Sequence, residues 1–265
     1  MPTNRRRMGT DPLTWIMEDG KTDDPPVTDK PQAKTSDEGQ RDAFDVLRVR
    51  AQPLSRLLAD YFICSHCLTV ARTDDHTGDE PQCPGCQRDT AGAGFYFTKP
   101  VHVIIDLMQD TYQSTSLTAR GPTADIPQLD LGHSLALLLF FCQLFEVVQE
   151  HVLRQIMSAT GIPQHAADRI LADNRDPRRR VGKIFPTVTG ESWRRAIEAL
   201  AADRNVDYID TLRFLKRSID LRDAFAVTAD LTPVDDELGK ACILRIDPLL
   251  DLYVSIHNRY VPHLT

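Results

Sequence analysis

The chain has 265 residues, of which 42% are hydrophobic and 26% are charged. This composition is ordinary for a soluble globular protein, and the length allows one or two domains with a sizeable core. The formal net charge of -7 excludes a protein coated in positive charge for nucleic acid, so any phosphate binding must be local.

The most apolar run, Leu135 to Cys142, is much shorter than the roughly 20 residues that a membrane span needs. The sequence places Asp11 and Glu18 where a secretory signal would carry its apolar stretch. We therefore expect a cytoplasmic protein with no membrane contact.

Residues 1–42 are rich in Pro, Thr, Asp, Gly and Lys, which predicts a disordered tail. Apolar residues at helical spacing, interrupted at Pro53, predict a helix between Ala43 and Phe62. That helix and the cysteine-rich segment after it form a predicted module over 43–113. The run Phe95 to Phe97 has the composition of a strand, whereas 101–113 fits either a buried strand or the start of a helix.

The strongest motif in the chain is a pair of cysteine knuckles, CSHC and CPGC, separated by 15 residues. Two such turns present four sulfurs in the tetrahedral arrangement of a zinc site, and Gly85 after Pro84 suits a tight turn. We therefore predict one structural Zn²⁺ ion in a zinc ribbon. Its ligands are Cys64, Cys67, Cys83 and Cys86.

A site closed by four thiolates has no open position for water or substrate, so the predicted ion stabilises the fold and does no chemistry. His66 and His76 are alternative ligands near the knuckles, and iron could occupy the same four sulfurs. Cys142 and Cys242 lie in apolar helical patterns and are interpreted as packed thiols.

Gly121, Pro122 and Pro127 mark 114–130 as a linker, and 131–265 is predicted to be an α-helical domain. Its longest helix is expected over 134–160, capped by Ser134 and stopped by Gly161. Further helical signals cover 166–173, 193–201 and 208–219, and a last helix is expected to start at Asp247 and Pro248. The fold class is thus mainly α, a helical bundle with a small β module.

A dense group of cations interrupts this otherwise acidic chain and could hold the phosphates of a nucleic acid, although such charge runs are more often solvated loops. The candidate nucleic-acid-binding residues are Arg175, Arg178, Arg179, Arg180 and Lys183.

The order of elements over about 133–262 resembles the HEPN family of helical domains. The resemblance rests on a long apolar helix with Phe145 and Glu146, a helix ending in Leu221, Arg222 and Asp223, and a closing helix with Tyr253. It implies a homodimer and RNA cleavage without metal, by an Arg, a polar residue after it, and a His separated from the Arg by four to six intervening residues.

Arg222 and Asp223 match the first two positions of that motif, but Val, Thr and Ala occupy 227–229 where the His belongs. Without a group that titrates near neutral pH, the usual acid–base step is missing. Arg259 and His263 form a second candidate catalytic pair, with a spacing one residue too short.

The sequence therefore predicts an RNA-directed protein in a defence or toxin system, either a metal-independent endoribonuclease or its degenerate relative. The alternative is a noncatalytic adaptor, in which ribbon and bundle bind a protein partner or nucleic acid.

Overall fold

The computed structural model describes residues 58, 61–72, 82–89, 93–118 and 130–261. The expected tail over 1–42 lies outside these residues, as does most of the helix expected between 43 and 62. The last two residues of that predicted helix, Tyr61 and Phe62, instead begin a strand, β1 (Tyr61–Ile63). The helix prediction is wrong there, because Tyr61 to Ile63 pair with two other strands rather than continuing a helical turn.

The described residues between 61 and 95 form the cysteine module, called the ribbon below. It contains a three-stranded antiparallel sheet in the order β2-β1-β3. Strand β2 (Val70–Arg72) pairs with β1 so that Phe62 lies opposite Ala71, and β3 (Gly94–Phe95) pairs on the other edge. The strand expected over Phe95 to Phe97 ends at Phe95. Tyr96 still donates its N–H to the Tyr61 carbonyl at 3.2 Å, and the rings of Tyr96 and Phe97 are buried against each other in the core.

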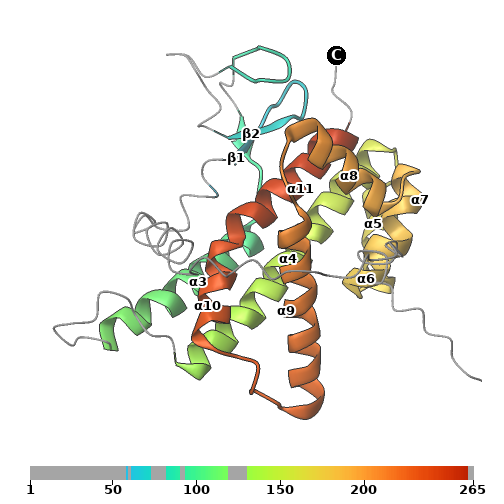
Figure 1. Ribbon diagram of the computed structural model, residues 1–265. Coiled ribbons are helices and arrows are strands. Elements are labelled where there is room, and N and C mark those ends of the chain that lie inside the picture. Colours follow the sequence, from blue (N-terminus) through green and yellow to red (C-terminus); the bar gives the residue numbers. More distant parts are fainter. Residues whose placement is uncertain (1–57, 59–60, 73–81, 90–92, 119–129, 262–265) are drawn as a thin grey trace, which may run out of the picture.

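The centre of the molecule is α4 (Leu131–Ala159), which confirms the long helix predicted from the sequence. Figure 1 shows it surrounded by α3 (Lys99–Thr118), α9 (Ile209–Thr228), α10 (Asp236–Leu244) and α11 (Ile246–Tyr260). Its buried side chains include Leu137, Phe141 and Val148, and these contribute to one core shared with its neighbours. The mainly α fold class is confirmed.

The ends of α4 differ in how well the sequence predicted them. The N-terminal cap is Asp130, whose carboxylate accepts the His133 N–H at 2.9 Å, and not Ser134, which is buried one turn later. At the other end Gly161 has a φ of +81°, and Ile162 N–H donates to the Met157 carbonyl at 2.9 Å. This is the glycine stop that the sequence predicted.

Helix α3 settles the ambiguity over 101–113 in favour of a helix, with Val101, Ile105 and Met108 on its buried face. It continues to Thr118, into the segment that was expected to be a linker. The hydroxyl groups of Thr111 and Ser114 donate to carbonyls of the preceding turn, so these polar residues are accommodated within the helix.

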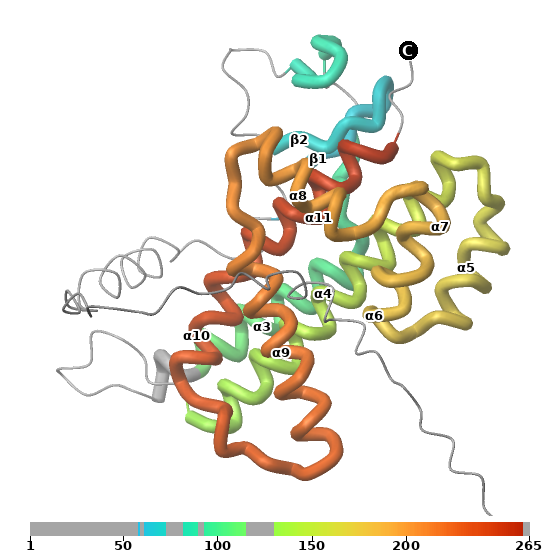
Figure 2. Tube along the Cα trace, turned by 45° about the vertical axis from the view of Figure 1, so that its right-hand side comes forward, coloured from blue at the N-terminus to red at the C-terminus, as the bar shows by residue number. Residues whose placement is uncertain are grey.

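Four of the remaining elements lie beside α4, away from α3 and α10 (Figure 2): α5 (Gln164–Asp173), α6 (Pro177–Arg179), a π-helical turn η3 (Arg180–Ile184) and α7 (Phe185–Thr189). Helix α8 (Trp193–Arg204) packs against α11. The helical signals over 166–173, 193–201 and 208–219 all fall on observed helices. The last helix starts at Ile246, earlier than the predicted cap at Asp247, because the chain turns at Arg245, which ends α10.

Among the described helices, α4 alone is long and apolar enough to cross a membrane by length and composition. Its buried residues contact α3, α10 and α11, as those of the core helix of a folded protein do.

The ribbon reaches this core through Tyr96, whose ring lies 4.9 Å from the rings of both His151 and His257. Burial lowers the pKa of His151 from 6.5 to about 4, and His257 and Arg154 act in the same direction. His151 is therefore a neutral core residue at pH 7.

Acidification is expected to destabilise the protein through His151. Below about pH 6.5 the unfolded chain binds a proton at this residue that the folded chain excludes. Its contribution to the free energy of unfolding should be intact above that pH and fall by up to about 3 kcal/mol as the pH approaches 4. Urea unfolding at pH 7 and pH 5 measures the loss, and His151→Gln should reduce it. An unchanged pH dependence in this variant would contradict the assignment.

Candidate metal centre and the groove beside it

The two cysteine knuckles have the same backbone structure. Cys64 N–H donates to the Thr69 carbonyl at 2.9 Å and Leu68 N–H to the Cys64 carbonyl at 3.0 Å. The second knuckle repeats both bonds, from Cys83 to Arg88 at 2.8 Å and from Gln87 to Cys83 at 2.7 Å.

Leu68 and Gln87, which follow the second cysteine of each knuckle, both have left-handed backbone, with φ of 60° and 58°. Such a conformation is uncommon outside glycine. Because it occurs at equivalent positions, the two knuckles bend in the same way, and each directs two thiols toward one point.

The four sulfur atoms lie within 4.8 Å of one another. Cys64 Sγ is 3.8 Å from Cys86 Sγ, and Cys67 Sγ is 3.5 Å from Cys83 Sγ. A tetrahedral ion with sulfur ligands at about 2.3 Å requires sulfur atoms about 3.8 Å apart. The cysteines are thus placed to bind one metal ion between the two knuckles.

Among the described residues, no neighbour of this cluster completes a different ligand set. His66 contacts Cys64 Sγ through its backbone N–H, while its ring lies 3.5 Å from Arg88. His76 lies outside the described residues. Cys142 and Cys242 are buried in the helical core and are not part of the cluster.

The surroundings shift the pKa values of two of these thiols, Cys67 and Cys83, in opposite directions. Burial raises the pKa of Cys83 to about 12. Burial acts in the same direction on Cys67, but hydrogen bonds with the Thr69 hydroxyl and backbone amide outweigh it and lower its pKa to about 6. Thr69 therefore stabilises a thiolate, the form that binds metals.

The space around Gly85 has no room for a side chain, which is a second reason for glycine beyond the tight turn. A Cβ atom at this position would lie 2.3 Å from Thr69 Oγ1 and 3.3 Å from Cys67 Sγ. The second knuckle thus packs against the first through a bare glycine.

Gly85→Ala is expected to weaken metal binding by about 10- to 100-fold, the range seen when groups that orient metal ligands are disturbed. Competition against a chromophoric chelator measures the affinity. Gly94→Ala is the matched control, because a Cβ there meets nothing within 4 Å. Equal affinities in the two variants would contradict the packing argument.

Side chains of α11 attach the ribbon to the helical body. Asn258 accepts the Val70 N–H and donates to the Val70 carbonyl, both at 2.8 Å, so it pairs with the outer edge of β2 as a neighbouring strand would. His257 Nε2 lies 2.9 Å from the Leu68 carbonyl, and Arg72 forms an ion pair with Asp247 at 3.3 Å.

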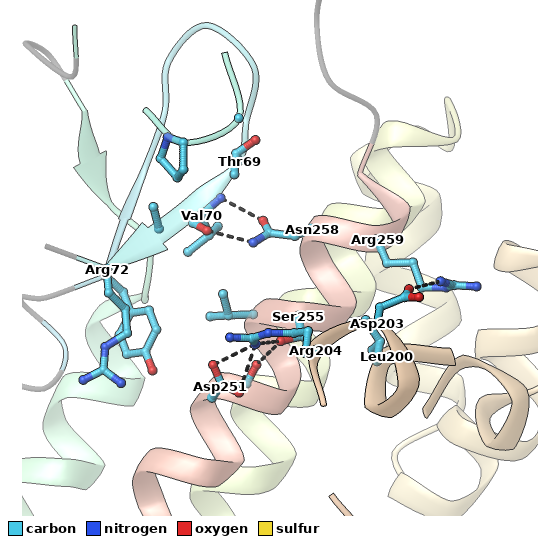
Figure 3. A pocket seen from close by; sticks show the side chains of 15 residues that line it. Thr69, Val70, Arg72, Leu200, Asp203, Arg204, Asp251, Ser255, Asn258 and Arg259 are labelled. Carbon is cyan, nitrogen blue, oxygen red and sulfur yellow. Dashed lines mark hydrogen bonds and ion pairs between the residues drawn. The ribbon is translucent and has the colours of Figure 1, made fainter. Parts of the chain in front are cut away.

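A groove of about 770 Å³ lies between the ribbon and helices α8 and α11. In Figure 3, Thr69 and Val70 stand on one side and Asp203 and Arg259 on the other, with Arg204 and Asp251 between them. Sequence reasoning missed this groove, because its residues come from distant segments and form no local motif.

The predicted catalytic residues Arg222 and Asp223 lie on α9 within a network of charges. The Arg222 guanidinium contacts Glu146 of α4, and its Nη2 is 3.0 Å from Asp223. Burial acts to lower the pKa of Arg222, but hydrogen bonds with these two carboxylates raise it. Within the described part of the chain, no recorded hydrogen bond of Arg222 involves a histidine.

The second predicted pair is on another helix. Arg259 of α11 lies 3.3 Å from Glu191 and 3.6 Å from Asp203, while His263 lies outside the described residues. Arg222 therefore contacts Asp223, the residue predicted to act with it. Arg259 instead contacts two carboxylates, and its predicted partner His263 is not described.

The cationic stretch divides into buried and exposed members. Arg180 is buried, with its Nη2 2.8 Å from Glu150 and its Nε 2.9 Å from the Asn174 carbonyl. Arg178 lies 3.2 Å from both Asp220 and Asp223. The other three are exposed: Arg175, Arg179 and Lys183.

No protein-family model, curated protein or solved structure matches this chain.

Proposed function

We propose that this chain is a zinc-stabilised, RNA-directed protein that binds RNA without cleaving it. In this proposal it is a cytoplasmic homodimer, a degenerate relative of the HEPN ribonucleases, in a defence or toxin system. The supporting observation is that Arg175, Arg179 and Lys183 are exposed along one short segment, with no ion pair recorded for them among the described residues. Such cations can contact phosphates without first giving up a carboxylate.

The surroundings of Arg222 support binding over cleavage. A phosphate would have to displace Glu146 and Asp223 from its guanidinium. Proton transfer to and from a ribose hydroxyl also needs a group that titrates near neutral pH, and the motif lacks its His. Arg222 is therefore assigned to holding α9 against α4.

A gel shift with single-stranded RNA at two salt concentrations tests the binding. Replacing Arg175, Arg179 and Lys183 together by alanine is expected to weaken binding and to reduce the salt slope by about two. Arg213→Ala is the control, because Arg213 is an exposed cation on α9, outside this segment. Binding that ignores salt, or that survives the triple replacement unchanged, would refute the proposal.

Incubation with mixed RNA in the presence of a chelator tests the absence of cleavage. Intact RNA is expected from the unmodified protein and from Arg222→Ala and His263→Ala. Cleavage that disappears in either variant would instead establish the ribonuclease.

The second candidate is a noncatalytic adaptor that binds a protein partner. It is favoured by the exposure of Phe95 on β3 and of Val103 and Leu107 on one face of α3. Failure of RNA binding in the gel shift would leave this function in its place. Sedimentation of the purified protein tests the homodimer.

A further inference from the structure

The groove between the ribbon and the helical body has the dimensions of a ligand site. Its volume, about 770 Å³, falls within the range of roughly 300–1,000 Å³ typical of small-molecule pockets. Its lining combines three arginines and two aspartates with the apolar side chains of Leu200, Val254 and Pro84. A ligand that fits has an anionic group, hydrogen-bonding groups and an apolar face.

Arg204 is the best-placed anchor for the anionic group. Its recorded hydrogen bonds, to Tyr208, Asp251 and Ser255, all use Nη1. Within the described residues, no hydrogen bond is recorded for its Nε–H and Nη2–H groups, and these form the edge of the guanidinium that binds phosphate or carboxylate with two parallel bonds. The side chain is 44% exposed, so a ligand can reach it.

Other groups on the groove wall suit the rest of such a ligand. Asp251 and Ser255 offer acceptors for sugar hydroxyl groups beside Arg204, and Leu200 and Val254 provide apolar contact for the face of a base. Tyr61 also lines the groove, and its hydroxyl is buried without a hydrogen-bond partner in the described structure. A buried hydroxyl of this kind is normally satisfied by an ordered water or another polar group.

A peptide fits this groove less well. Peptides commonly bind beside a sheet by pairing with an exposed strand edge. Here the edge of β2 is already occupied, because the Asn258 amide binds both the N–H and the carbonyl of Val70.

We propose that the groove binds a nucleotide, free or as part of a single RNA strand, with its phosphate on Arg204. The choice of ligand rests on the proposed RNA-directed function, but the site is separate from the segment 175–183. The arginine–aspartate pairs at the rim, such as Arg259 with Asp203 at 3.6 Å, would tune the affinity for the anion.

Calorimetric titration of the metal-loaded protein with nucleoside monophosphates tests the site, with nucleosides, inorganic phosphate and a short RNA as separate arms. Nucleotides are expected to bind more tightly than nucleosides or phosphate alone. Arg204→Lys keeps the charge but removes the two-bond edge, and should weaken binding at least tenfold. Arg194→Lys, on the exposed side of the same helix, is the matched control and should bind normally.

A variant that is expected to bind more tightly cannot owe its effect to misfolding. Asp203→Asn removes a carboxylate from the rim and should tighten nucleotide binding by about twofold. Absence of nucleotide binding, binding unaffected by Arg204→Lys, or phosphate binding as tightly as the nucleotide would each overturn the proposal. So would a peptide that binds the groove and is not displaced by nucleotides. If mononucleotides bind but the RNA gel shift fails, the groove site stands and the RNA-directed function does not.

Discussion

Replacement of Cys83 by serine is expected to abolish stoichiometric metal binding and to unfold the ribbon, while the helical body keeps its helices. The strands have only two or three residues each, and although Tyr61 and Val70 pack on the helical core, the knuckles contain only a small cluster of three buried cysteines. A cluster of this size cannot hold the knuckles together without the ion, whose binding is worth about 10–16 kcal/mol in comparable zinc modules. By contrast, α4 and its neighbours share a large apolar core.

Elemental analysis measures the metal, and hydrogen exchange followed by mass spectrometry measures the protection of residues 61–72. Far-ultraviolet circular dichroism reports on the helices. Ser65→Ala is the matched control, since Ser65 is an exposed residue within the same knuckle. Undiminished protection of 61–72 in metal-free Cys83→Ser protein would show that the ribbon does not depend on a metal.

Arg180→Met is expected to lower the free energy of unfolding by about 1–3 kcal/mol, because groups around the buried guanidinium lose its hydrogen bonds. The Arg180 guanidinium joins the carbonyls at the end of α5, at Leu171 and Asn174, to Glu150 on α4. Methionine fills part of the volume but removes these hydrogen bonds, including the Nε–H donor of the Asn174 carbonyl, while Glu150 keeps its contact with Arg154. Urea unfolding followed by circular dichroism measures the change.

Arg179→Met provides the comparison, because Arg179 is exposed and adjacent in sequence. It should unfold like the unmodified protein and should instead bind RNA more weakly. If both variants were equally stable, Arg180 would not have the structural role that its contacts indicate.

Sequence patterns predicted those features whose cause is local. The spacing of Cys64, Cys67, Cys83 and Cys86 predicted the knuckles, since two residues between cysteines fit one turn around an ion. The apolar run around Leu135 to Cys142 predicted α4, and Gly161 predicted where it ends. The segment after Pro53 was predicted less well, because the apolar residue Tyr61 suits a strand as well as a helix, and sheet pairing selects the strand.

The sequence by itself therefore determined a cysteine-rich metal module followed by helices, because cysteine spacing and helical periodicity act over a few residues. Only the tertiary structure decided which arginines are available. Arg180 is enclosed by α4 and α5, whereas Arg179 beside it is exposed to solvent. The two differ because adjacent residues on a helix point in different directions. The groove was likewise decided by packing, since Asn258 on α11 meets Val70 on the ribbon across 188 positions of the chain.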